Sequence, residues 1–195
     1  MIADKLKGHS IVLASASPRR QQYFKEMGIP FKVQTLPVEE VYPPHLQGEE
    51  ISEYLAVLKA SQFKDQLRDK TIVITSDTVV WHRGVSLAKP QDREEAIRML
   101  QTLSNDWHQV ITSVCFTTCS TQKTATYKTK VKFRKLAEEE IHHYVDHYKP
   151  FDKAGGYGIQ EWIGLIGIEE IQGSYSNVVG LPTHLVYKTL MSMVG

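Results

Sequence analysis

The sequence predicts a globular chain in which strands alternate with helices around one strand at the centre of a sheet. The central strand is the segment 71–81, which is nearly continuous in β-branched apolar residues, as in a strand buried on both faces. The segment 10–14 predicts a second strand, which leads directly into a helix at 21–27. Segments 49–64 and 137–148 carry apolar residues at the spacing of amphipathic helices.

Turn and cap signals delimit the other predicted elements. Gly28 and Pro30 end the first helix. The segment 82–84 reads as a hairpin turn, and Asp92 with Glu95 forms a capping-box-like helix start. These signals predict strands at 31–36, 85–88, 107–118 and 124–133, a helix after Asp92 and a last helix at 183–193.

Length and composition limit the class of protein. The chain of 195 residues suits a single domain over 1–195, or two small lobes around one core. A formal net charge of +1 gives no basic field, so we expect no nucleic-acid partner. No apolar run approaches membrane-spanning length and the N-terminal residues lack a signal-type stretch, so we expect a cytoplasmic protein without a membrane partner.

Two cysteines, Cys115 and Cys119, lie four apart in an apolar segment. This spacing is not that of a metal site, and two thiols make no disulfide framework. We expect both to be buried core thiols, as fits a reducing cytosol.

The segment 15–20 offers two hydroxyls and two guanidiniums beside a helix N-terminus. Ser17 is a good N-cap, and Pro18 suits the first helical position because its missing N–H costs nothing there. Free amides, the helix dipole and the forked donors of Arg19 and Arg20 favour a phosphate. A well-capped helix with two solvated arginines is the alternative.

Asp77 interrupts the most apolar strand of the chain. Burying a charge without a partner is costly, so Asp77 should be paired, metal-bound or at a cleft edge, or else satisfied by backbone amides. The pair Glu39 and Glu40 follows a strand and suits either a metal or a solvated turn. Lys59 lies next to an apolar helical stripe, so it can lean into a cleft or into water.

Two further segments carry weaker signals. Three glycines lie among charged and amide side chains at 152–160, which suggests close backbone approach to a ligand or simply a tight loop. Glu139, His143 and His147 are spaced i, i+4 and i+8, but without an HExxH pattern a solvated helix face is the favoured interpretation.

Taken together, these polar residues suit a polyphosphate bound with a divalent metal. Mg²⁺ prefers oxygen ligands and is usually held by one or two carboxylates plus substrate phosphates. A nearby carboxylate can deprotonate the attacking water, and Arg and Lys stabilise charge that develops on the phosphates. The chain has no GxxxxGK[ST] loop and no GxSxG motif, so P-loop and nucleophile-elbow chemistry are excluded.

Several motifs in order resemble the Maf family of nucleoside triphosphate pyrophosphatases (septum-formation inhibitor-like proteins). They are LASASPRR at 13–20, EE at 39–40, KA at 59–60, SDTVV at 76–80, KP at 89–90, DKAGGYGIQ at 152–160 and GSYSNVVGLP at 173–182. The resemblance extends over nearly the whole chain. It implies an α/β fold with a mixed twisted sheet, flanking helices and two lobes around a central cleft, as in Maf and ITPase-like proteins.

The resemblance also implies an activity and roles for individual residues. The expected reaction is hydrolysis of the α–β phosphoanhydride to a nucleoside monophosphate and pyrophosphate, with Mg²⁺ or Mn²⁺ held by Glu40 and Asp77. Asp77 is the expected proton acceptor. The implied catalytic residues are Asp77, Glu40, Lys59 and Lys89, and the implied substrate-binding residues are Ser15, Ser17, Arg20 and Lys153.

Three positions resemble family members that prefer dTTP and UTP, namely Arg19, Thr78 and Gln160. The sister group that acts on 7-methyl-GTP carries Trp at the position of Arg19. Arg and Gln can donate hydrogen bonds to pyrimidine carbonyls, whereas Trp would stack on a cationic methylated purine. Two departures from the family pattern, Ser113 and Glu161, stand where Gly is common and concern local loop shape.

Three alternatives remain open at this stage. The first is hydrolysis of 7-methyl-GTP or of a broad range of modified nucleotides. The second is a non-catalytic nucleotide-binding regulator of cell division, and the third, nucleic-acid binding, is disfavoured by the near-zero charge. A homodimer is expected because it is common among members of the family.

Overall fold

The computed structural model describes residues 2–194. The strands are β1 (Ser10–Leu13), β2 (Lys32–Val33), β3 (Thr71–His82), β4 (Val85–Leu87), β5 (Trp107–Thr117), β6 (Gln122–Phe133) and β7 (Ile168–Gln172). The helices are α1 (Ile2–Lys5), α2 (Pro18–Glu26), α3 (Glu49–Ser61), α4 (Arg93–Leu103), α5 (Glu138–Tyr148), α6 (Trp162–Gly167), α7 (Tyr175–Val179) and α8 (Thr183–Val194). Short 3₁₀ turns are η1 (Lys64–Gln66) and η2 (Ala154–Gly156).

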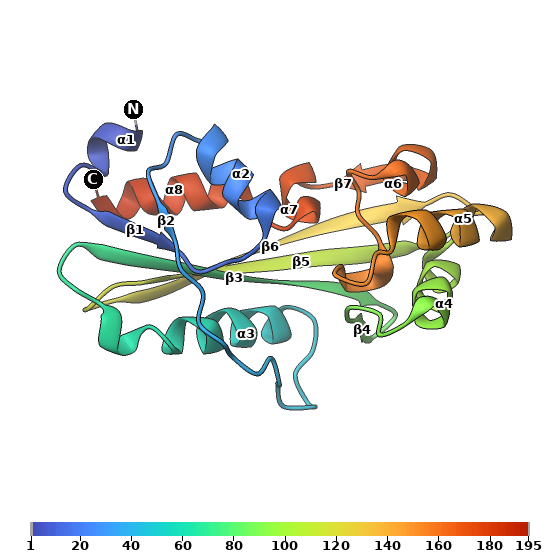
Figure 1. The fold of residues 1–195 in the computed structure, drawn as a ribbon, viewed down its shortest axis with the longest axis horizontal. Coiled ribbons are helices and arrows are strands. Elements are labelled where there is room, and N and C mark those ends of the chain that lie inside the picture. The colour runs from blue at the N-terminus through green and yellow to red at the C-terminus, as the bar shows by residue number, and fades with distance from the viewer. Residues whose placement is uncertain (1, 195) are drawn as a thin grey trace. The chain divides into compact units, whose positions relative to one another are not determined.

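The strands form a mixed sheet in the order β2-β1-β3-β5-β6-β7, with β4 hydrogen-bonded to β3 (Figure 1). β1 pairs parallel with β2 and β3, whereas β3 with β4 and β6 with β7 pair antiparallel. The α/β class with a mixed sheet and flanking helices is therefore confirmed. No helix among residues 2–194 is long and apolar enough to cross a membrane.

The chain divides into two compact units, each with its own core. Unit 1 comprises residues 1–77, 112–127 and 180–195, and unit 2 comprises 78–111 and 128–179. The strands β3, β5 and β6 each contribute residues to both units. The central cleft implied by the family resemblance stays a prediction.

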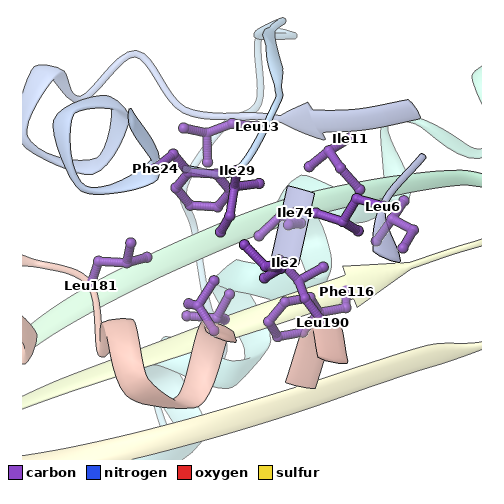
Figure 2. Packing of buried hydrophobic residues seen from close by; sticks show 13 residues of the cluster. Ile2, Leu6, Ile11, Leu13, Phe24, Ile29, Ile74, Phe116, Leu181 and Leu190 are labelled. Atoms are coloured by element: carbon purple, nitrogen blue, oxygen red, sulfur yellow. The ribbon is translucent and has the colours of Figure 1, made fainter. Parts of the chain in front are cut away.

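Unit 1 carries helices on both faces of its strands. In Figure 1, α2 and α8 cover one face and α3 covers the other. Strand alternation explains this arrangement, because Leu13 and Ile74 point into the core with Phe24 of α2 and Leu190 of α8, as Figure 2 shows. Val73, which precedes Ile74 on β3, faces the opposite side of the sheet, where it packs with Phe63 beyond the end of α3.

Unit 2 has a smaller aliphatic cluster on its strands. Val80 of β3, Val110 of β5 and Val131 of β6 are buried together. Ala154 of η2 packs on this cluster, and a Cβ added to Gly155 would approach Val80 Cγ1 to 3.0 Å. The glycine turn after residue 152 therefore lies directly on the strand surface.

The strand predicted after the first helix is much shorter than expected. The sequence predicted 31–36, but only Lys32 and Val33 pair, with Val12 and Leu13 of β1. β1 itself ends at Leu13, so the following residues have no further β1 residue to pair with.

The prediction for the two thiols was half wrong. Cys115 on β5 is buried, but Cys119 is exposed. Cys119 lies in the β5–β6 turn, where Thr118 and Thr121 hydrogen-bond to each other and hold the chain at the surface.

Candidate active site

The loop between β1 and α2 is organised by its two serines. Ser17 is the N-cap of α2, and its side chain accepts from the Arg20 backbone N at 3.4 Å. Ser15 Oγ accepts from the Ser17 backbone N at 3.3 Å. The predicted cap and the predicted place of Pro18 in the first turn are both confirmed. The loop therefore holds two hydroxyls beside the positive end of a nine-residue helix.

Arg20 connects this loop to the end of strand β3. Its Nε donates to the carbonyl of Gly180 at 2.8 Å, and its Nη1 donates to the carbonyl of Ser76 at 3.0 Å and to Ser15 Oγ at 3.4 Å. Ser76 immediately precedes Asp77. The guanidinium thus fixes the loop against the residue next to the buried carboxylate, a positioning task that sequence reasoning did not predict.

Lys59 and Asp77 form a close, partly buried ion pair within unit 1. Lys59, in the last turn of α3, donates from Nζ to Asp77 Oδ1 at 2.6 Å, and Glu40 Oε1 lies 3.1 Å from the same Nζ. The exposed fractions of these side chains are 17% for Lys59, 10% for Asp77 and 45% for Glu40. Lys59 therefore leans toward two carboxylates rather than into open water.

Burial raises the pKa of the Asp77 carboxyl above its ordinary value. The Lys59 and Arg20 cations oppose this shift, and the Glu40 carboxylate adds to it. Because burial outweighs the cations, an ionised Asp77 is a stronger base than a carboxylate in water.

Four further predicted site residues belong to unit 2. Thr78 follows Asp77 on β3 and is half-buried, and Lys89 is exposed just beyond β4. Lys153 and the exposed Gln160 lie at either end of the loop that contains η2. The roles predicted for these four residues, and for the half-buried Arg19 in unit 1, stay predictions.

A family comparison places the whole constellation in one protein family. Residues 10–193 match the family model described as Maf-like protein. The chain belongs to the Maf family. Its motifs therefore have a common origin with those of other Maf proteins, as the resemblance of the sequence indicated.

Curated relatives of this Maf chain are similar over its full length. A protein named dTTP/UTP pyrophosphatase from Christiangramia forsetii is 54% identical over 194 residues, covering 100% of this chain and 99% of that protein. Proteins of the same name from Flavobacterium johnsoniae and Bacteroides fragilis are 48% and 50% identical, covering 100% and 96% of this chain and 100% and 98% of their own lengths.

A solved Ham1 protein from Staphylococcus aureus is similar over 64% of this chain and 71% of its own. The TM-score is 0.47 and the identity is 17%, which is too weak a likeness to bear on function.

The two carboxylates at Lys59 fit a hard divalent cation. Both face one point, since both contact the same ammonium. Among residues 2–194, no three His, Cys, Asp or Glu side chains gather to hold a metal by themselves. Mg²⁺ commonly takes only one or two carboxylates and completes its shell with waters and substrate phosphates. The donor set of this Maf chain therefore fits a cation that binds together with a polyphosphate.

The helix face of α5 is occupied by aromatic contacts. The rings of His143 and His147 lie 4.2 Å apart between centroids, and His143 lies 4.9 Å from Trp162 on α6. His147 Nδ1 lies 2.8 Å from the backbone oxygen of His143. Both histidines are also exposed, in agreement with the favoured interpretation of a solvated helix face.

Two residues that hold the loop around η2, one on the loop and one on α5, were not predicted from the sequence. Glu161 contacts Lys153 and the hydroxyl of Tyr144 on α5. The sequence signal was the departure of Glu161 from the family pattern, which was interpreted only as a matter of loop shape. Tyr144 gave no signal, because a tyrosine at core spacing on an amphipathic helix is read as packing.

Proposed function

We propose that this chain is a nucleotide pyrophosphatase that hydrolyses dTTP and UTP to the nucleoside monophosphate and pyrophosphate. The observation that carries the proposal is the Lys59 ammonium held between Asp77 at 2.6 Å and Glu40 at 3.1 Å, beside the capped loop of α2. Full-length identity of about half to proteins named for this activity supports it.

The loop of α2 and the two lysines supply the binding part of the mechanism. Ser15 and Ser17 offer hydroxyls, and the first turn of α2 offers the Arg19 backbone N–H with the positive end of the dipole. Lys59 and Lys89 add cationic charge that stabilises the departing pyrophosphate. Arg20 keeps the loop in register with β3 through the carbonyls of Gly180 and Ser76.

Asp77 is the base that activates water. The water oxygen bonds to the α-phosphorus, and its proton passes to Asp77. The P–O bond that bridges the α- and β-phosphates breaks, and its electron pair leaves with the pyrophosphate. Burial keeps Asp77 more basic than an exposed aspartate. Lys59 holds the carboxylate in place through a hydrogen bond between charged groups.

A divalent cation completes the proposed site. Glu40 and Asp77 would hold it, and substrate phosphates and waters would complete its shell. When bound, the cation neutralises phosphate charge and lowers the pKa of water. In the structure the Lys59 ammonium lies between the two carboxylates and reduces their mutual repulsion.

Base selection is assigned to Arg19, Thr78 and Gln160. Arg and Gln side chains can donate to the carbonyl groups that thymine and uracil share. A site built on such hydrogen bonds rejects a base that leaves its polar groups unpaired.

A panel of substrates tests the proposal. Pyrophosphate release is measured with dTTP, UTP, CTP and 7-methyl-GTP at equal concentration and with saturating Mg²⁺. The expected kcat/KM is highest for dTTP and UTP. Higher kcat/KM on 7-methyl-GTP or CTP would contradict the assigned specificity, and no turnover of any nucleotide would contradict the proposed activity.

A further inference from the structure

We propose that Glu161 and Tyr144 are positioning residues for base selection, which act by fixing the turn that presents Gln160. The inference rests on the proposed function, because it concerns which triphosphate the site accepts. All residues involved lie in unit 2.

Gln160 stands at the corner of a turn that Glu161 closes. The Glu161 backbone N donates to the Gly158 carbonyl at 3.0 Å, so Ile159 and Gln160 are the two central residues of the turn. Ile159 is buried, whereas Gln160 is exposed. The buried residue anchors the turn and directs the neighbouring amide side chain outward.

The carboxylate of Glu161 ties the turn to both of its neighbours. Lys153 Nζ lies 3.1 Å from Glu161 Oε1, which closes the loop from residue 153 to residue 161. The Tyr144 hydroxyl of α5 donates to Glu161 Oε2 and accepts from the Gly158 backbone N at 3.0 Å. Each carboxylate oxygen thus has its own donor, and a single hydroxyl holds two points of the turn.

These groups are sheltered from water, which makes the contacts worth more than surface pairs. The exposed fraction of the side chain is 10% for Lys153 and 25% for Glu161, and Tyr144 is fully buried. A partly buried carboxylate that lost a donor would carry an unpaired charge, which is costly. Burial, followed by the Glu161 hydrogen bond, raises the pKa of Tyr144, so its hydroxyl stays protonated and remains a donor.

The absence of a side chain at Gly158 lets this arrangement form. A Cβ there would lie 2.9 Å from Glu161 Cδ and 3.1 Å from Lys153 Cε. The ion pair therefore packs directly over the bare backbone of the turn. Lys153 also contacts Asp152 at 2.6 Å, so its ammonium serves two acidic side chains of the same loop.

A fixed turn matters for the choice between uracil and cytosine, because a glutamine amide can both donate and accept hydrogen bonds. The Gln160 side chain can donate to a uracil carbonyl or accept from a cytosine amino group. The amide can rotate about its last side-chain bond whatever the backbone does, so a fixed turn sets how close the amide lies to the base edge. A turn that relaxes by about 1 Å would lose selectivity, because misplacement of that size weakens oriented contacts strongly.

Two variants test the inference. Glu161→Gln keeps the shape of the side chain but removes the charge, and Tyr144→Phe removes only the hydroxyl. Both should reduce the preference for UTP over CTP about tenfold, mainly through a higher KM for UTP, with kcat within about twofold of wild type. Glu138→Gln, an exposed position at the start of α5, is the matched control and should change neither constant.

A double-mutant cycle separates positioning from general loss of structure. Gln160→Ala alone should lose the same preference, and Gln160→Ala combined with Glu161→Gln should lose no more. Equilibrium affinities for UTP and CTP are measured alongside turnover, so the selectivity of binding is judged even if turnover is absent. Absent turnover in the wild type would contradict the proposed function alone.

Two results would overturn the inference itself. One is an unchanged affinity ratio in Glu161→Gln and in Tyr144→Phe. The other is additive losses from the Gln160 and Glu161 substitutions.

Discussion

At the scale of single residues, the charged side chains of Asp77, Lys59 and Arg20 in the proposed site are sheltered from water and paired. Asp77 is buried between apolar residues of β3, and the 2.6 Å contact with Lys59 offsets part of the desolvation cost. Arg20 directs its donors to two backbone carbonyls. The side chains expected to do chemistry are therefore held by neighbours whose own positions are fixed.

Replacing Asp77 tests the base. Asp77→Asn keeps the size of the side chain but cannot accept the proton, so kcat should fall at least about a hundredfold. Nucleotide affinity and the melting temperature should stay near wild type. The exposed Asp69→Asn serves as the control with full activity. Full turnover by Asp77→Asn would remove this residue from the mechanism.

His108 makes a testable contribution to stability against pH. Burial, with a smaller effect from His82, lowers the pKa of His108 from 6.5 to about 3. The folded histidine stays neutral while the unfolded one gains a proton below pH 6.5, so this contribution is present above that pH and is lost as the pH falls. At pH 5 the loss is about 2 kcal/mol in the free energy of unfolding.

Urea unfolding of wild type and of His108→Gln at pH 7.5 and pH 5 measures this difference. Gln can still hydrogen-bond the Tyr157 hydroxyl, which lies 2.6 Å from His108 Nε2. The variant should lose about 2 kcal/mol less than wild type between the two pH values. Equal losses in the two proteins would show that His108 does not titrate in this way.

At the scale of elements, helix starts define the loops that carry function. Ser17 caps α2 and Asp92 caps α4, where Asp92 Oδ1 accepts from the Glu95 backbone N at 2.8 Å. Only the first of these caps also forms part of the proposed phosphate loop. Comparing the two caps therefore distinguishes the effect of an N-cap on stability from its effect on substrate binding.

Removing each cap in turn makes that separation. Ser17→Ala and Asp92→Ala should each lower the free energy of unfolding by about 1 kcal/mol, the usual cost of a lost N-cap. Ser17→Ala should also raise the KM for UTP, whereas Asp92→Ala should leave it unchanged. The prediction fails if both variants, or neither, change the KM.

Long periodic segments were predictable from sequence, as were the short strands β1 and β4, but other short segments were not. The predicted central strand 71–81 agrees with β3, and the helix predicted from residue 49 agrees with α3 except at its end. The six residues of α6 and the five of β7 are too few to show a period, and they were missed. The length of β2 was overestimated because the apolar pattern of a segment does not reveal where its partner strand ends.

The site itself was predictable only in part. Ser17 and Asp77 carried local signals, a cap and a charge in an apolar strand. The contacts of Lys59 with Asp77 and of Tyr144 with Glu161 join residues 18 and 17 positions apart on different elements. Such contacts depend on tertiary packing. The family resemblance named both residues of the first contact and did not identify the second contact.

At the scale of the whole molecule, the chain passes between its two units at residues 77, 111, 127 and 179. The crossings at residues 77, 111 and 127 lie inside the strands β3, β5 and β6, not in flexible linkers. We therefore expect the units to unfold together, because melting one would interrupt hydrogen-bonded strands of the other.

The natural tryptophans provide the test. Trp81, Trp107 and Trp162 all belong to unit 2, so fluorescence reports on that unit. Ile74→Val in unit 1 and Ile163→Val in unit 2, both fully buried positions, should each cost about 1 kcal/mol. Both should shift the fluorescence and the circular-dichroism transitions equally. A fluorescence transition unmoved by Ile74→Val would instead indicate independent units.

The close approach of Glu161 to the bare backbone at Gly158 has an evolutionary consequence. A Cβ at 158 would meet Glu161 Cδ at 2.9 Å and Lys153 Cε at 3.1 Å, so a side chain there would push both partners of the ion pair aside. Because the family pattern carries glycine at both positions, an acid at 161 should arise, and persist, only in descendants that retain glycine at 158.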